Sequence, residues 1–506
     1  MFERASGVLL HPTSLPGRYG LGDLGPWAYK FVDYLAAHDQ RLWQVLPLGP
    51  TSYGDSPYQA LGASAGNPLL ISLDRLVEQG WLTEGDLADA FFPNERVEFG
   101  NVIPYHFDRL FRAYQAFAVK AGQAARAEFE GWCAGNQFWL DDFALFMALK
   151  NAHGGRPWVE WEPELVQRQP GALAVARAQH AEAIDSVKFN QWQFFSQWSA
   201  LKAYANERGI LLIGDAPIFV AHDSSDVWAN PGLFYLDKKG YPTVIAGVPP
   251  DYFSATGQRW GNPLYRWGEM AKDDYAWWIS RLRQTLATVD MVRIDHFRGF
   301  EAYWEIPASE ATAVVGQWVK GPGTDFFEAV QRQLGDLPII AEDLGVITPG
   351  VEALRDDFGL PGMKVLQFAW GDLTGAEPFL PHNHVPNCVV YSGTHDNNTT
   401  VGWFNEEATP AMKDHLNVYL DREVREIQWE LIRVGEMSVA RWFVAPLQDI
   451  LGLDSEARMN LPGREGGNWS WRALPADFEH DGILRLQHYT KLYGRAIEPE
   501  TDEASA

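Results

Sequence analysis

Cysteine is scarce in this sequence. Cys133 and Cys388 are the only two cysteines among 506 residues. Two isolated cysteines cannot build a disulfide framework, and they are typical of a reducing compartment. Neither cysteine is flanked by a histidine or by a sharp strand-to-helix turn, so the sequence does not indicate a cysteine nucleophile. We therefore expect a cytoplasmic protein.

Positive charge and long apolar runs are also lacking. Lysine and arginine number 41 against 66 aspartates and glutamates, which gives a formal charge of −25. Nucleic acids and anionic membrane surfaces are bound through basic patches, so both are excluded as expected partners. No run approaches the ~18–20 apolar residues of a membrane span, and residues 1–6 lack the basic and apolar regions of a signal peptide. No obligatory protein partner is evident.

The chain has the composition of a folded protein, with 46% hydrophobic and 13% aromatic residues. Length alone would allow roughly three domains, but we find neither an internal repeat nor a long linker. Short apolar stretches predict eight strands, most of them separated by helical patterns, at residues 7–10, 42–47, 210–215, 291–295, 338–342, 363–370, 389–394 and 441–446. This alternation predicts an α/β fold, a (β/α)8 TIM barrel spanning residues 1–506, whose active site lies at the carboxyl ends of the strands.

Two long segments interrupt the alternation. Residues 67–200, after the second strand, show helical periodicity without a convincing strand, which predicts an inserted helical subdomain. Residues 216–272, after the third strand, are rich in proline, glycine and aromatic residues. A segment that long is rarely a simple connection, so we expect a loop-rich insertion over the active site.

Three predicted strands end in acidic residues. In Met291-Val-Arg-Ile-Asp-His-Phe-Arg-Gly-Phe300, Arg293 and Asp295 lie two residues apart and therefore point to the same face of a strand. A guanidinium next to a carboxyl group on the same face of a strand favours the ionised form of Asp295. By itself this pattern also fits a plain salt bridge, but apolar stretches ending in Glu342 and Asp396 repeat it. Three acids at strand ends predict one site.

Three carboxylates without a metal cluster suit glycosidic chemistry. One acid attacks the anomeric carbon, and another stays protonated to donate to the leaving oxygen. Arg293 would keep Asp295 charged, whereas the apolar strand around Glu342 would raise its pKa. Asp396 is then available to bind substrate hydroxyls more strongly in the transition state.

Two other patterns point elsewhere and are set aside. Gly20-Leu-Gly-Asp-Leu-Gly25 matches a dinucleotide-binding pattern, which would make the chain an NAD-dependent oxidoreductase. A phosphate-binding turn should directly follow its strand, however, and here nine residues intervene. His382, His384 and Cys388 lie close together, but no second ligand cluster lies near them in the sequence, and Pro386 prevents a helix from aligning them. We expect no cofactor and no metal.

Aromatic residues gather in the segment Pro249–Tyr265, which holds Tyr252, Phe253 and Trp260. Aromatic side chains on a loop over a barrel suit stacking on the apolar faces of sugar rings. They suit anchoring of the loop to the barrel equally well, so both interpretations stay open. If the segment covers the site, Tyr252 and Phe253 would help to keep water from a glycosyl-enzyme.

Taken in order along the chain, these patterns closely resemble the amylomaltases, also called disproportionating enzymes or 4-α-glucanotransferases, of glycoside hydrolase family 77 in the α-amylase superfamily. The resemblance covers nearly the full length. It rests on Leu10-His-Pro-Thr-Ser-Leu15, Ser56-Pro-Tyr58, Gly214-Asp-Ala-Pro-Ile-Phe-Val220, Arg259-Trp-Gly-Asn-Pro-Leu-Tyr265, Arg293-Ile-Asp-His-Phe-Arg-Gly299, Ala341-Glu-Asp-Leu-Gly345, Gly393-Thr-His-Asp-Asn397, Arg458-Met-Asn-Leu-Pro-Gly463 and Gly467-Asn-Trp-Ser-Trp471.

The resemblance implies a (β/α)8 barrel that transfers α-1,4-glucan segments between maltooligosaccharides or starch-type glucans with retention, and cyclic products when the transfer is intramolecular. It makes Asp295 the nucleophile, Glu342 the general acid/base and Asp396 the transition-state stabiliser. Arg293 and His395 match supporting positions around the donor sugar. Substrate contacts are implied for Asp215, Gln258, Trp260, Phe368 and Asn460, and Tyr53 matches a loop with a second glucan site.

Two rival functions use the same residues. A hydrolase would differ only in the acceptor, water in place of a sugar hydroxyl. A catalytically silent barrel that binds glucans is the other, although the presence of all three acids counts against it.

Overall fold

The computed structural model describes residues 3–250, 254–372, 374–464 and 466–496, and Tyr53 by its backbone alone. Its centre is a parallel sheet of eight strands in the order β10-β11-β12-β1-β2-β3-β6-β9. The strands are β1 (Ala5–Leu9), β2 (Leu42–Gln44), β3 (Leu211–Pro217), β6 (Met291–Asp295), β9 (Ile339–Ala341), β10 (Gly362–Val365), β11 (Cys388–Tyr391) and β12 (Trp442–Pro446).

The two ends of this strand order meet. The Ala341 N–H, at the end of β9, donates to the Pro361 carbonyl just before β10 at 2.9 Å. The Met363 N–H of β10 donates to the Asp343 carboxylate at 2.7 Å. The sheet therefore closes into the predicted (β/α)8 barrel, and all eight predicted strands are present.

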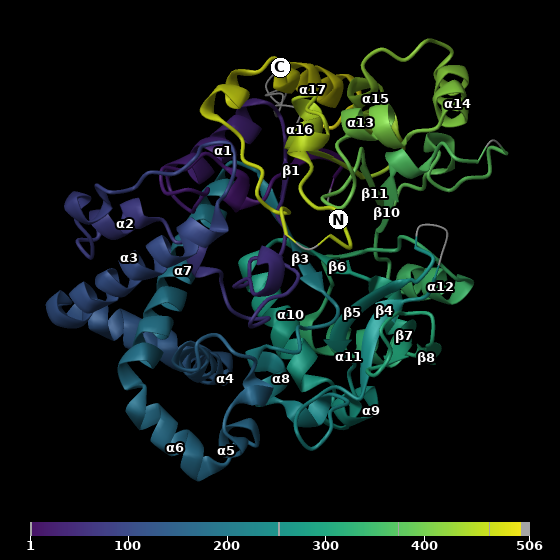
Figure 1. The fold of residues 1–506 in the computed structure, drawn as a ribbon. Coiled ribbons are helices and arrows are strands. Elements are labelled where there is room, and N and C mark those ends of the chain that lie inside the picture. The colour runs from purple at the N-terminus through teal and green to yellow at the C-terminus, as the bar shows by residue number, and fades with distance from the viewer. Residues whose placement is uncertain (1–2, 251–253, 373, 465, 497–506) are drawn as a thin grey trace, which may run out of the picture.

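Helices surround the barrel and fill the long connection between β2 and β3 (Figure 1). That connection holds α2 to α7, of which α3, α4 and α7 lie together on one side of the molecule. The helices are α1 (Pro26–Ala37), α2 (Leu73–Glu78), α3 (Phe99–Lys120), α4 (Gln123–Ala152), α5 (Pro163–Val166), α6 (Pro170–Gln179), α7 (Ala181–Glu207), α8 (Ser225–Ala229), α9 (Trp267–Met270), α10 (Ala276–Thr288), α11 (Gly323–Leu334), α12 (Pro349–Asp357), α13 (Thr400–Gly402), α14 (Pro410–Leu420), α15 (Ile427–Met437), α16 (Leu447–Ile450) and α17 (Gly482–Leu492).

The sequence pattern explains why these helices cover the barrel. Helix α1 begins at Pro26, whose fixed φ suits the first helical turn, and it buries Phe31 and Leu35 completely on one face. In β6, Val292 and Ile294 are also completely buried. Apolar surface from both layers is thus removed from water, which stabilises a barrel wrapped by helices.

A second sheet was not predicted from the sequence. It is antiparallel, with the strand order β5-β4-β7-β8, and it lies on one side of the barrel near α9 (Figure 1). Its strands are β4 (Val244–Val248), β5 (Gln258–Pro263), β7 (Ala302–Pro307) and β8 (Gln317–Lys320). β4 and β5 fall within residues 216–272, where we expected loops, because the prolines and glycines there hide the two-residue alternation of a strand.

Three predicted strands were too long, since the predicted stretches 42–47 and 389–394 run past β2 and β11, which end at Gln44 and Tyr391. The apolar run 363–370 continues past β10, which ends at Val365, into a short 3-10 turn at Leu366–Phe368. Leu366 is as buried as a strand residue, so hydrophobicity alone cannot locate the point where the hydrogen-bonded ladder stops.

None of the described helices combines the length and the apolar character that crossing a bilayer requires. The carboxyl-terminal helix α17 is followed by Arg495, which is completely buried. Its guanidinium pairs with the buried Glu436 at 3.1 Å and donates to the carbonyls of Ala5, Arg441 and Ala440. This arginine therefore joins the segment after α17 to the first barrel strand, β1.

We predict that Arg495→Ala lowers the unfolding free energy by about 3–5 kcal/mol, because it leaves the Glu436 carboxylate buried without its ion-pair partner. Thermal unfolding of both proteins at one scan rate measures the change. Arg332→Ala is the matched control, since Arg332 forms an exposed ion pair with Asp274 and such pairs contribute little. Equal melting temperatures for the wild type and Arg495→Ala would contradict the prediction.

Candidate active site

The register between β3 and β6 places one arginine between two acids. Asp215 pairs with Arg293 across the two strands, and Pro217 pairs with Asp295. Arg293 Nη1 donates to both Asp215 oxygens at 2.9 and 2.8 Å, and Nη2 donates to Asp295 Oδ1 at 2.9 Å. Burial opposes the charge of this guanidinium, but the two carboxylates outweigh that effect and raise the pKa of Arg293 well above its ordinary value.

Glu342 follows β9 directly and is held by two backbone amides. The His296 N–H donates to Glu342 Oε2 at 2.6 Å, and the Leu344 N–H donates to Oε1 at 2.9 Å. Burial raises the pKa of Glu342 to about 7, although Arg293 and the two amides act in the opposite direction. This carboxyl can therefore exchange a proton near neutral pH, as a general acid/base must.

The chain bends sharply directly after Asp295. His296, directly after Asp295, has a left-handed backbone with φ 56°, which costs a non-glycine residue about 1–2 kcal/mol. The bend directs the His296 amide to Glu342, and the His296 ring lies perpendicular to Trp260 with 4.8 Å between ring centroids. Strain of this kind concentrates at functional sites.

Asp396 lies on the open side of the site. It follows β11 in a turn in which the Asn397 side chain accepts hydrogen bonds from the Thr394 N–H and hydroxyl at 2.9 Å each. Asp396 Oδ1 accepts from the Asn460 side chain at 2.6 Å, and Oδ2 lies 3.4 Å from His395 Nε2. The side chain of Asp396 remains 48% exposed, so a ligand could reach it.

Tyr58 completes this arrangement, and our sequence analysis did not assign it to the site. Its hydroxyl donates to Asp215 Oδ2 at 2.7 Å, and its ring stacks on His395 at 5.0 Å. The motif Ser56-Pro-Tyr58 was part of the family resemblance, but within that loop the resemblance pointed to Tyr53. The order of residues alone does not show that the Tyr58 side chain turns toward Asp215.

The structure brings most of the predicted residues together. Hydrogen bonds join Arg293 to Asp215 and Asp295, and the His296 amide, directly after Asp295, donates to Glu342. The His296 ring contacts Trp260. Tyr58 links Asp215 to His395, which lies beside Asp396 and its partner Asn460. Gln258 lies on β5 beside Trp260, whose indole N–H donates to the Gln258 side chain at 3.1 Å. Phe368 lies in the turn after β10, is 37% exposed and packs edge-on against Phe379 at 5.6 Å.

Three predicted contacts cannot be placed. Tyr252 and Phe253 lie outside the described residues, and for Tyr53 the structure gives only a short turn at Tyr53–Asp55.

The histidines near Cys388 have other partners. His384 Nε2 lies 2.9 Å from the Phe379 carbonyl, and His382 contacts the Tyr419 hydroxyl and the Gly375 carbonyl. Within the described ranges, no group of three or more histidine, cysteine, aspartate or glutamate side chains is arranged to hold a metal ion.

Comparison with known proteins places this chain in a family. A family profile described as 4-alpha-glucanotransferase matches residues 10–476. The chain is 54% identical to the 4-alpha-glucanotransferase of Thermus thermophilus, over 95% of this chain and 97% of that one. It is 51% identical to the enzyme of Synechocystis sp., over 98% and 99% of the two chains.

Solved structures agree with this assignment. An amylomaltase from Streptococcus agalactiae in complex with acarbose is 40% identical and superposes with a TM-score of 0.95, over 98% of this chain and all of that one. The amylomaltase of Corynebacterium glutamicum shares the fold, with a TM-score of 0.80 over 96% of this chain and 75% of that one, at 17% identity. The hydrolase and silent-barrel interpretations are therefore not favoured, and the chain belongs to the amylomaltases, the 4-α-glucanotransferases of glycoside hydrolase family 77.

Proposed function

We propose that Asp295, Glu342 and Asp396 carry out the glucan transfer by a retaining double displacement. Asp295 attacks the anomeric carbon while Glu342 donates its proton to the glycosidic oxygen, so that one glucan leaves and a glycosyl-enzyme forms. The Glu342 carboxylate then removes the proton from an acceptor hydroxyl, which displaces Asp295 and restores the original anomeric configuration.

The contrast between the environments of two acids carries this assignment. Asp295 accepts a charge-assisted hydrogen bond from Arg293, which suits an ionised nucleophile. Glu342 is buried, with its pKa raised to about 7, which suits a group that gives and takes a proton. Neighbouring titratable groups held in unlike environments are the usual sign of divided acid/base roles.

Asp396 supports the reaction without forming a covalent bond to the substrate. Its half-exposed carboxylate, steadied by Asn460 and His395, is available to hydroxyls of the sugar at the cleavage point. Hydrogen bonds to those hydroxyls that strengthen as positive charge develops would lower the barrier.

The substrates we propose are α-1,4-glucans and maltooligosaccharides, with cyclic products from intramolecular transfer. The amylomaltase of Streptococcus agalactiae has been solved with acarbose, and it aligns with this chain over nearly the full length. For Tyr53 the proposal rests on the family resemblance alone, and for Tyr252 and Phe253 it rests on their place in the aromatic segment Pro249–Tyr265. The proposed substrate contacts are Arg293, His395, Asp215, Gln258, Trp260, Asn460, Phe368, Tyr252, Phe253 and Tyr53.

We also propose a cytoplasmic location. Both cysteines are free, and Cys388 is buried, which is typical of proteins in reducing compartments. Cell fractionation with an antibody to the protein would test this.

We predict that Asp295→Asn loses more than about a thousandfold of the maltotriose disproportionation rate, because a neutral amide cannot form the glycosyl-enzyme. The purified variant should keep its melting temperature and its affinity for maltooligosaccharides. Asp274→Asn, which changes an exposed carboxylate, is the control and should keep full activity. A smaller loss in Asp295→Asn would place the nucleophile elsewhere.

We predict that Glu342→Gln is slow in the first step on natural glucans, by about 10²–10⁴-fold, but regains the rate of that first step on a glycosyl fluoride. Fluoride leaves without a proton, so the first step survives the loss of the acid while the second lacks its base. Glycosyl-enzyme should then accumulate, and an increase in intact mass would report it. Equal losses on both donors would remove Glu342 from this role.

We predict that kcat/KM on maltotriose falls as the pH rises through about 7, because the pKa of Glu342 is raised to about 7 and the first step needs its protonated form. The decrease should approach tenfold per pH unit. A glycosyl fluoride donor should not show this decrease, and recovery of activity on return to pH 6 excludes unfolding. A decrease that is the same for both donors would contradict the assignment.

A further inference from the structure

Arg458 joins three segments around Asp396 without touching the Asp396 carboxylate. Its Nη2 donates to the Asp396 backbone carbonyl at 2.7 Å, and its Nε donates to the Asn460 backbone carbonyl at 2.8 Å. Its Nη1 donates to Glu407 Oε1 at 3.1 Å. The guanidinium therefore bonds to the turn after β11, to the segment after β12 and to the helical turn Trp403–Glu407 between them.

Asp396 needs such support because it stands on a turn. Its side chain is 48% exposed, and the bond from the Asn460 side chain is its shortest side-chain contact, at 2.6 Å. Asn460 itself is fixed by its N–H, which donates to the His395 carbonyl at 3.1 Å. Arg458 donates to the backbone carbonyls of both residues of this pair, Asp396 and Asn460. Its hydrogen bonds therefore help to fix the position of the Asp396 carboxylate.

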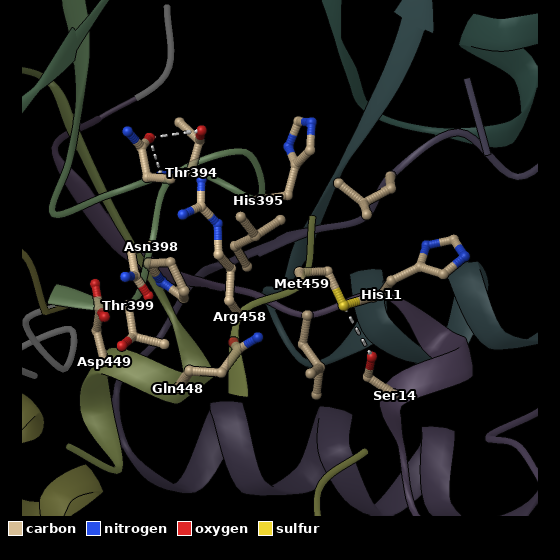
Figure 2. Close-up of a pocket in the computed structure, with 15 residues that line it drawn as sticks. His11, Ser14, Thr394, His395, Asn398, Thr399, Gln448, Asp449, Arg458 and Met459 are labelled. Carbon is tan, nitrogen blue, oxygen red and sulfur yellow. Dashed lines mark hydrogen bonds between the residues drawn. The ribbon is translucent and has the colours of Figure 1, made fainter. Parts of the chain in front are cut away.

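Glu407 fixes Arg458 in turn. The same Glu407 oxygen that accepts from Arg458 also accepts from the Asn398 side chain at 3.0 Å, and Asn398 donates further to Ser455. Trp403–Glu407 is a single π-helical turn, a feature that often marks functional sites. The side chain of Arg458 is only 18% exposed, and it lines a pocket together with Thr394, His395 and Asn398 (Figure 2).

We propose that Arg458, held by Glu407, is a positioning residue that fixes the Asp396 carboxylate for the transition state. This inference rests on the proposed role of Asp396. A displacement of about 1 Å in a catalytic group can cost about 10²-fold in rate. A lysine would keep the positive charge but not the planar set of donors that reaches three acceptors at once.

The test is a double-mutant cycle of Arg458→Gln and Asp396→Asn on maltotriose disproportionation. In the wild-type background we expect Arg458→Gln to lower kcat by about 10–100-fold with a smaller change in KM. If Arg458 acts through Asp396, the same change in the Asp396→Asn background should cost less than about threefold. Equal losses in both backgrounds would overturn the proposal.

Further variants separate positioning from folding. Glu407→Ala should reproduce much of the kcat loss of Arg458→Gln, and this loss should likewise shrink in the Asp396→Asn background. Glu407→Gln keeps an oxygen that accepts from Arg458 and should therefore be more active than Glu407→Ala. Arg464→Gln, at an exposed arginine six residues along the same segment, should leave kcat unchanged. Should Arg458→Gln fail to fold, the cycle is run with Glu407→Ala, and additive losses there would likewise overturn the proposal.

The two proposals fail in different ways. Full activity of Asp396→Asn alone would remove Asp396 from catalysis, whatever Arg458 does. A large loss in Asp396→Asn combined with wild-type kcat in Arg458→Gln would leave the catalytic assignment intact and reject only the positioning role.

Discussion

The buried guanidinium of Arg293 is the interaction on which the site depends. Removing a cation from water costs several kcal/mol, and only close, hydrogen-bonded carboxylates offset that cost. Asp215 supplies two such bonds from β3, and Asp295 supplies a third from the same strand as the arginine. A shift of one residue in the register between β3 and β6 would turn Asp215 away and leave the charge without its main partner. The electrostatics of the site therefore also select the register of the barrel.

From this ion pair the other features follow in order. With Asp295 paired to Arg293, the chain turns through the left-handed His296 and offers its amide to Glu342. The carboxyl of Glu342 is thus held by backbone groups, which cannot titrate, while burial keeps its pKa near neutrality. The two acids on adjacent strands thus differ in their contacts: Asp295 accepts a hydrogen bond from the Arg293 guanidinium, whereas the buried Glu342 accepts from two backbone amides.

The third acid is supported differently. Asp396 stands on a loop, and its partners come from segments after two further strands, β11 and β12. Loops can vary without disturbing the barrel, which makes them suitable for substrate recognition, but they need added bonds to hold a group in place. The network around Asn460 and Arg458 meets that need, and it explains how an exposed carboxylate can have a defined position.

The sequence alone was sufficient for the barrel, because the strands of a parallel sheet are short, apolar and separated by helices. It also predicted that Asp295, Glu342 and Asp396 belong to one site, since residues at the carboxyl ends of barrel strands share one face. It could not reveal the antiparallel sheet that carries Trp260, nor the inward turn of Tyr58, nor the bonds of Arg458 to two backbone carbonyls. The sheet and the Arg458 bonds depend on main-chain groups that every residue possesses, and the Tyr58 contacts join side chains far apart in the sequence. Only the folded chain therefore decides which of these groups meet.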